Sequence, residues 1–335
     1  MRAVGEKNRR SDSGTGRWSA LALLVMLGSL CLWGSGGGVE VANAQPAPVP
    51  TDAGTPTLKP MQSGIAERPI LRVTGVLVAN TVKQGNVLNV YLNDSSTVGH
   101  PTAGATAEFA GRKATFFPKK DGSLLALVPV SVFQKPGAYT LSISGTQGDP
   151  LKPVPVSVIN AAFKTQNVSV SKSTEGLQPF PGEMEAIQAL KERVSPLKFW
   201  DEGFISPTPD CQNSPFGVLR LHNGVPTGDY HKGVDLRSPA GRPIRAINGG
   251  VVQIAQMFRL HGGTVGLDHG QGVGSIYIHM SRLNVTPGQR VKKGDVLGFV
   301  GATGFATGPH LHWGMYVSGL PVNPNQWLPK VPRCN

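Results

Sequence analysis

The chain has 335 residues with 43 glycines and 28 prolines, 16% of its residues are charged, and its formal net charge is +12. This glycine and proline content excludes a mainly helical protein and favours short strands joined by turns. The positive charge would draw an exported protein to anionic cell-wall polymers, but no recognisable nucleic-acid-binding module accompanies it, so we expect no nucleic-acid partner.

Residues 1–44 are organised like a secretory signal peptide. A basic region precedes an apolar stretch from Ala20 to Trp33, which has the length of a signal-peptide core and is short for a membrane span. Ala42-Asn43-Ala44 before Gln45 fits a cleavage site. We therefore expect export to the periplasm or beyond the cell envelope, with no stable transmembrane segment after processing. An uncleaved anchor is the alternative.

Residues 45–69 are rich in proline and alanine, which is typical of a flexible linker. Five short alternating runs follow between residues 70 and 160: LRVTGVLV (71–78), VLNVYL (87–92), ATFFP (114–118), LLALVPV (124–130) and YTLSI (139–143). Strands at this spacing, separated by glycine and proline, predict an immunoglobulin-like β-sandwich. We expect this domain to act as a spacer or to bind a partner, with autoinhibition as the alternative.

Residues 161–199 form a predicted connector with one short helix. From Gly182 to Val194, the apolar residues Met184, Ile187, Leu190 and Val194 recur at helical spacing. A helix of this length is marginal alone, so we expect it to pack on a neighbouring domain, with Met184 and Ile187 on its buried face.

Residues 200–335 contain the most informative pattern, two histidines at 310 and 312 and a His231/Asp235 pair upstream. In an extended strand, His310 and His312 point to the same face, so their imidazoles are close enough to share a metal ion. Zinc accepts neutral imidazole nitrogens and carboxylate oxygens as ligands. The pattern therefore predicts a catalytic zinc site, although spacing alone does not say which histidine of the pair binds metal.

His231 and Asp235 reach one ion only if the chain bends between them, because four extended residues span about 13 Å. Gly233 permits such a bend, and a helical placement is disfavoured by Gly233 and Val234. We therefore place His231 at the end of a loop and Asp235 in a strand over 234–236. The alternative is a surface hydrogen-bonded pair, with the later histidines merely lining a strand.

Ordered blocks around these residues show that the segment from about 214 to 328 resembles the lysostaphin-type zinc endopeptidases of the M23 family. The blocks are SPFG (214–217), HKGVDL (231–236), SPAGRPI (238–244), NGGVV (248–252), LDHG (267–270), YIHM (277–280), VKKGDVLG (291–298), GATG (301–304) and GPHLHW (308–313). Ordered blocks over this length are far more specific than one short motif. In many relatives an arginine follows Phe-Gly closely, whereas here Val218 and Leu219 precede Arg220, which puts a substrate contact by Arg220 in doubt.

The resemblance implies a mainly β fold, in which the sandwich is followed by an antiparallel β-sheet peptidase domain. It implies that His231, Asp235 and His312 bind Zn²⁺ and that His279 and His310 are catalytic, orienting and deprotonating water and stabilising the charge that forms. The implied activity is hydrolysis of peptide bonds in peptidoglycan stems or cross-bridges. The alternative is a non-catalytic peptidoglycan-binding or amidase-activating protein of the same fold. Neither the oligomeric state nor the bond that is cut follows from the sequence.

The remaining histidines and cysteines have weaker signals. His100 and His261 lie in glycine-rich loops, and we expect His222 and His269 at most to line the cleft. Removal of the leader takes Cys31 with it and leaves Cys211 and Cys334. An even pair in an oxidising compartment predicts a disulfide bond, with two unpaired thiols as the alternative.

Overall fold

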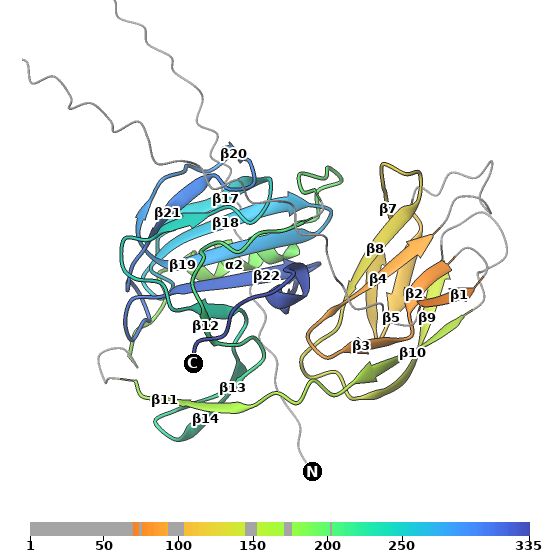
Figure 1. Ribbon diagram of the computed structural model, residues 1–335, viewed down its shortest axis with the longest axis horizontal. Helices are drawn as coiled ribbons and strands as arrows, with labels where there is room; N and C mark the ends of the chain where they lie inside the picture. The colour runs from red at the N-terminus through yellow and green to blue at the C-terminus, as the bar shows by residue number, and fades with distance from the viewer. Residues whose placement is uncertain (1–69, 74–75, 93–103, 145–152, 171–175, 202) are drawn as a thin grey trace, which may run out of the picture. The chain divides into compact units, whose positions relative to one another are not determined.

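The computed structural model describes residues 70–335, apart from residues 74–75, 93–103, 145–152, 171–175 and 202 (Figure 1). The predicted signal peptide and linker lie outside the described residues, and so does His100. The described part is mainly β-strand, as the composition predicts. None of its helices combines the length and the apolar character needed to span a membrane.

Two five-stranded sheets build the first domain. One has the order β1 (Ile70–Val73), β2 (Val76–Ala79), β4 (Val87–Leu92), β8 (Leu124–Pro129), β7 (Phe117–Pro118). The other has the order β3 (Thr81–Lys83), β10 (Val154–Ile159), β9 (Gly137–Ser144), β5 (Thr106–Phe109), β6 (Arg112–Thr115). Apolar residues of both sheets, among them Val90 and Val156, form one buried cluster. The expected sandwich is therefore present, and its immunoglobulin-like character stays a prediction.

The strand predictions for this domain were incomplete. The run 71–78 divides into β1 and β2, which pair with each other as antiparallel strands. The sequence reasoning also missed β3, β5 and β10. Val154 and Val156 of β10 are buried, with exposed Pro155 between them, so the alternation is present but short.

The second domain is built on one large sheet. Its main path is β12 (Gln212–Ser214), β15 (Val234–Leu236), β22 (Leu311–Val317), β19 (Val273–Leu283), β18 (Gly263–Gly270), β17 (Gly250–Met257), β20 (Arg290–Val291). Three further strands branch from it: β16 (Pro243–Arg245), β21 (Val296–Val300) and β23 (Leu320–Val322), which is followed by the 3₁₀ helix η2 (Pro324–Trp327). A separate small sheet contains β11 (Thr165–Val168), β13 (Leu219–His222) and β14 (Val225–Tyr230).

Strand alternation divides the large sheet into a core face and a second face. Leu311 and Trp313 of β22 are both 0% exposed and belong to the core, so His312 between them points to the opposite face. Asp235 of β15 and Ile278 of β19 are both paired with His312. Their side chains therefore lie on the same second face of the sheet.

The connector helix α2 (Glu183–Glu192) packs on that second face of the large sheet (Figure 1). Ile187 and Leu190 join an apolar cluster on the sheet that includes Ile276 and Tyr316. The expectation that Met184 lies on the buried face was wrong, because Met184 is 46% exposed. The helix instead buries Glu183, Ile187 and Leu190, an i, i+4, i+7 stripe that begins with a charged residue.

Cys211 and Cys334 form the disulfide bond that the cysteine count predicts, with a sequence separation of 123 residues. In the chain-entropy account, a closed loop of this size stabilises the native state by about 4–5 kcal/mol.

His269 is a core residue and does not line a cleft. It is 0% exposed. Its Nδ1–H donates to the carbonyl oxygen of Gly249 at 2.6 Å, and its Nε2 lies 2.8 Å from the hydroxyl of Ser275. A neutral ring satisfies both contacts, and burial lowers the pKa of His269 to about 4 despite the nearby Gly249 carbonyl and Asp268 charge.

His269 should make stability rise with pH between about 4 and 6.5, its folded and ordinary pKa values. In this window the unfolded state binds more protons than the native state, so raising the pH stabilises the protein. The variant His269→Asn removes the titrating ring. Urea unfolding at a series of pH values should give it a slope shallower by about one proton than the unmodified chain. Equal slopes in the two proteins would contradict this role.

Candidate functional site

The site forms where β14, β15 and β22 meet. Pairing of β15 with β22 sets Asp235 directly opposite His312, and His231 lies in the short connection that follows β14. The bend between His231 and Asp235 requires a glycine. A Cβ atom at Gly233 would lie 2.4 Å from the Trp313 carbonyl oxygen and 2.7 Å from His312 Nε2. The predicted loop position of His231 and strand position of Asp235 are both confirmed.

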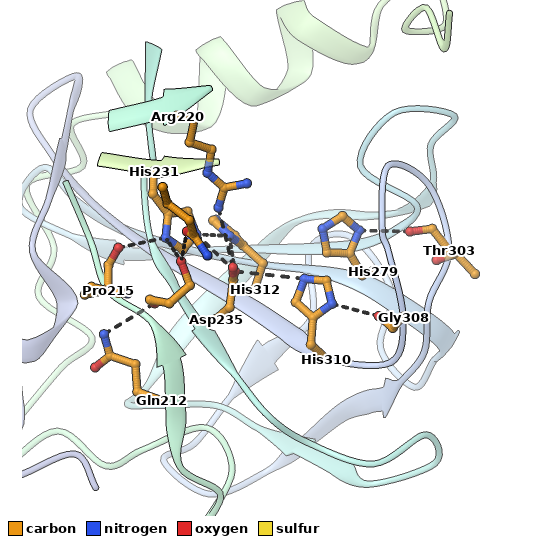
Figure 2. Close-up of polar contacts among 12 residues, drawn as sticks. Gln212, Pro215, Arg220, His231, Asp235, His279, Thr303, Gly308, His310 and His312 are labelled. Atoms are coloured by element: carbon orange, nitrogen blue, oxygen red, sulfur yellow. Dashed lines mark hydrogen bonds and ion pairs between the residues drawn. The ribbon is translucent and has the colours of Figure 1, made fainter. Parts of the chain in front are cut away.

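Three electron-rich atoms converge at this point (Figure 2). His231 Nε2, Asp235 Oδ1 and His312 Nδ1 lie 3.0 Å from one another in each of the three pairs. About 3.3 Å is the separation of two ligand atoms on a tetrahedral zinc with bonds of about 2.0 Å. The three side chains thus have the chemistry and the spacing of a metal-binding set. That they bind a metal stays a prediction.

Hydrogen bonds fix which nitrogen of His231 faces the cluster. Its Nδ1–H donates to the carbonyl oxygen of Pro215 at 2.9 Å, so the neutral ring presents a lone pair at Nε2. The side chain of His231 is only 2% exposed. A backbone acceptor that holds the far nitrogen in this way is the usual second contact of a metal-binding histidine.

Burial and mutual contact shift the pKa values of the cluster. Desolvation lowers the pKa of His312 to about 4, although Asp235 opposes that shift. For Asp235, desolvation acts to raise the pKa, but the charges and hydrogen bonds of His231 and His312 outweigh it and hold the pKa well below its usual range. The carboxylate is therefore ionised and His312 is neutral near pH 7, which are the protonation states that a metal requires.

His279 and His310 complete a second pair beside the cluster, with ring centroids 4.8 Å apart. The Nδ1–H of His279 donates to the Thr303 carbonyl oxygen at 2.9 Å, and that of His310 donates to the Gly308 carbonyl oxygen at 2.8 Å. Each neutral ring therefore keeps Nε2 as a free acceptor. Nε2 of His310 lies 3.9 Å from Asp235 Oδ1, and the free nitrogen of His279 is turned toward the cluster (Figure 2).

His279 is a buried histidine with a strongly lowered pKa. Burial, followed by the charges of His310 and His312, lowers its pKa to about 3. Its backbone has φ 64°, a left-handed conformation that residues other than glycine rarely adopt. All five residues predicted for the site are thus brought together, while their roles are not tested by geometry alone.

Arg220 is a site residue that sequence reasoning left in doubt. Its Nη2 lies 3.4 Å from Asp235 Oδ2, whereas His231 and His312 contact the other carboxylate oxygen, Oδ1. The sequence does not predict this contact, because fifteen residues separate Arg220 from the predicted metal ligand Asp235.

His222 lies outside the cluster, and so do two tyrosines that are close in sequence to site residues, Tyr230 and Tyr277. His222, at the end of β13, stacks on Phe305 with ring centroids 5.6 Å apart. Tyr277 is 0% exposed in the core, where its hydroxyl accepts from the Ile247 N–H. Tyr230 packs on Phe216, and burial raises its pKa to about 12.

Comparison with known proteins finds similarity in this domain. The sequence model of Peptidase family M23 matches residues 229–324. DD-carboxypeptidase/endopeptidase Mpg of Neisseria meningitidis is 41% identical over 112 residues, which are 33% of this chain and 26% of that protein. Peptidoglycan DD-endopeptidase ShyC of Vibrio cholerae is 38% identical over 112 residues, which are again 33% of this chain and 26% of that protein. The chain therefore spans about a quarter of the length of these curated relatives.

A solved structure extends the similarity beyond this domain. A crystal structure of an M23 peptidase candidate from Pseudomonas aeruginosa is 28% identical, has a TM-score of 0.55, and covers 73% of this chain and 93% of that chain. The covered 73% of this chain is a larger fraction than the residues after 160 make up. The similarity therefore reaches into the first β domain.

Asp235→Asn should weaken binding of a divalent metal by more than about 100-fold, because the amide has no negative charge and only one acceptor oxygen. Competition with a chromophoric chelator would measure the affinity. Asp229→Asn is the matched control, since Asp229 is exposed and pairs with Lys232. Equal affinities of the two variants would rule out Asp235 as a ligand.

Proposed function

We propose that the second domain, in which residues 229–324 match the model of Peptidase family M23, makes this chain an exported zinc metallo-endopeptidase. It would hydrolyse peptide bonds in the stems or cross-bridges of bacterial peptidoglycan. The observation that carries this proposal is the convergence of His231, Asp235 and His312. Their ligand atoms lie 3.0 Å from one another in a largely buried place, a spacing at which one cation could contact all three.

Zinc fits this donor set, because two imidazole nitrogens and one carboxylate oxygen are ligands that it commonly takes. Three protein ligands leave a fourth position open, as in catalytic rather than structural sites. When bound, zinc would supply Lewis-acid polarisation of a carbonyl and a lowered pKa for water. His231 Nε2, Asp235 Oδ1 and His312 Nδ1 would hold it.

His279 and His310 are the proposed proton-handling residues. The Nδ1–H of His279 is held by a backbone carbonyl, so its Nε2 is left to accept a proton from the attacking water. The Thr303 carbonyl fixes the ring for this transfer. Once protonated, a histidine beside the scissile bond can pass a proton to the leaving amine or donate to the oxygen that gains negative charge. No covalent enzyme adduct is required.

The proposed substrate class rests on the relatives. Mpg and ShyC are both named as enzymes that cut DD bonds, and ShyC is named for peptidoglycan. Without residues 1–44, which contribute +2 of the net charge of +12, the exported chain keeps +10, and this charge favours binding to an anionic polymer such as the cell wall. Export remains part of the proposal on the strength of the basic and apolar segments before Gln45.

Digestion of purified peptidoglycan by the chain from residue 45 tests the proposal. We expect new amine ends, detected by mass analysis of the fragments, that disappear with a chelator and return with added zinc. His279→Ala should lose release by at least about 100-fold while keeping its zinc, because a general base contributes about 10²–10⁴-fold. His231→Ala should lose both zinc and activity.

Two outcomes would contradict the proposal. Intact peptidoglycan after prolonged digestion by a zinc-loaded protein would favour the non-catalytic binding or amidase-activating alternative. Release that survives complete removal of the metal would contradict the metallo-endopeptidase assignment. All five predicted site positions are occupied by the expected residue types here, which favours catalysis.

A further inference from the structure

Glu183, the first residue of α2, is a fully buried carboxylate outside the five site residues. It accepts hydrogen bonds from three successive backbone N–H groups, those of Arg259, Leu260 and His261, at 3.1, 3.0 and 2.9 Å. The Nδ1–H of His261 donates to it at 2.7 Å, and the N–H of Phe180 donates at 3.0 Å. The loop between β17 and β18 thus forms an anion-binding nest, and the connector helix supplies the anion.

The carboxylate must be charged and must have two oxygens to fill this nest. Burial acts to raise the pKa of Glu183, but the hydrogen bonds from the His261 ring and from the backbone of Phe180 and His261 outweigh it, so the pKa lies below its usual value. A glutamine has one acceptor oxygen and would turn an NH₂ group toward backbone donors. The nest therefore distinguishes Glu from Gln at this position.

The same loop holds the main chain around His279. The carbonyl oxygen of His261 accepts from the His279 N–H at 3.0 Å, and that of Leu260 accepts from the Phe305 N–H at 2.8 Å. Gly262 lies against Thr303 with φ +66°, and a Cβ there would be 2.3 Å from Thr303 Oγ1. The loop therefore contacts both His279 and the segment that carries Thr303.

Thr303 transmits the position of the loop to the imidazole ring. Its Oγ1 accepts from the Gly263 N–H at 2.9 Å and donates to the Met280 carbonyl oxygen at 2.7 Å. Its own carbonyl oxygen accepts from His279 Nδ1–H at 2.9 Å. The ring and the main chain of His279 are thus both fixed by partners of one loop, which is what a left-handed residue at φ 64° needs to persist.

We propose that Glu183 is a positioning residue for His279, acting through the backbone of residues 259–263 and through Thr303. Glu183 lies outside residues 229–324, the part of the chain that matches the family model. The connector helix therefore supplies a buried contact that the matched segment does not contain. This inference rests on the proposed function, because a positioning role requires a reaction in which His279 takes part.

The test compares Glu183→Gln with Glu185→Gln, a matched change at an exposed position of the same helix. Hydrogen exchange followed by mass spectrometry would report on the amides of 259–263 and 277–281, and thermal unfolding and zinc content would be measured alongside. We expect exchange in both segments to be at least about tenfold faster in Glu183→Gln. The amides of 259–261 lose the anion that orders the loop, and the His279 N–H is bonded to that loop. Glu185→Gln should match the unmodified chain.

Activity on cross-linked peptidoglycan fragments supplies the second readout. We expect Glu183→Gln to lower kcat by about 10–100-fold, as small displacements of a catalytic group do, with KM and zinc content within about twofold of the unmodified chain. A merely structural role would lower activity only in proportion to the unfolded fraction. That result, or unchanged exchange at 277–281, would overturn the inference.

Two further measurements separate the possible failures. If Glu183→Gln does not fold, His261→Ala keeps the carboxylate and its backbone donors, and it should show the same changes in exchange and kcat to a smaller extent. If the amides of 277–281 exchange as slowly in His261→Ala as in the unmodified chain, the inference is overturned. If the unmodified chain is inactive, the proposed function fails, whereas exchange at His279 still decides whether Glu183 orders that segment.

Discussion

The register of β15 against β22 is the constraint on which the second domain depends. Asp235 and His312 face each other across these strands, and each lies between residues that are 0% exposed: Val234 and Leu236 on one strand, Leu311 and Trp313 on the other. A slip of one residue would turn the polar pair into the core and the apolar residues out of it. Burial of the core therefore forces the acceptor atoms to remain together.

Three histidines of the site are each held by a hydrogen bond to a backbone carbonyl. Pro215, Thr303 and Gly308 each accept the Nδ1–H of one histidine, so three rings have a defined tautomer before any ligand arrives. Preorganised groups of this kind cost no reorganisation when a reaction takes place. The proposed metal-binding and proton-handling residues are thus held in the same way, by a backbone carbonyl that fixes an imidazole.

The sequence predicted the parts of this site that depend on local chain geometry. The glycine at 233 indicated the bend that brings His231 near Asp235, and alternation placed His310 and His312 near each other. The distinction between these two histidines came only from the family resemblance. The role of Glu183 was missed because its partners lie 76 to 78 residues away and helical periodicity reports only apolar residues. The same reasoning wrongly placed Met184 on the buried face, since the charged residue before it occupies that position.

Because of the disulfide bond between Cys211 and Cys334, the effect of a proteolytic cut in this domain depends on where the cut falls. All five site residues lie within the covalent loop that it closes, so a single nick anywhere inside the loop leaves two fragments that stay joined. A nick between α2 and Cys211 has a different result, because everything upstream is then held to residues 211–335 by noncovalent contacts alone. The helix that carries Glu183 and strand β11 are consequently parts of the second domain that limited proteolysis can detach.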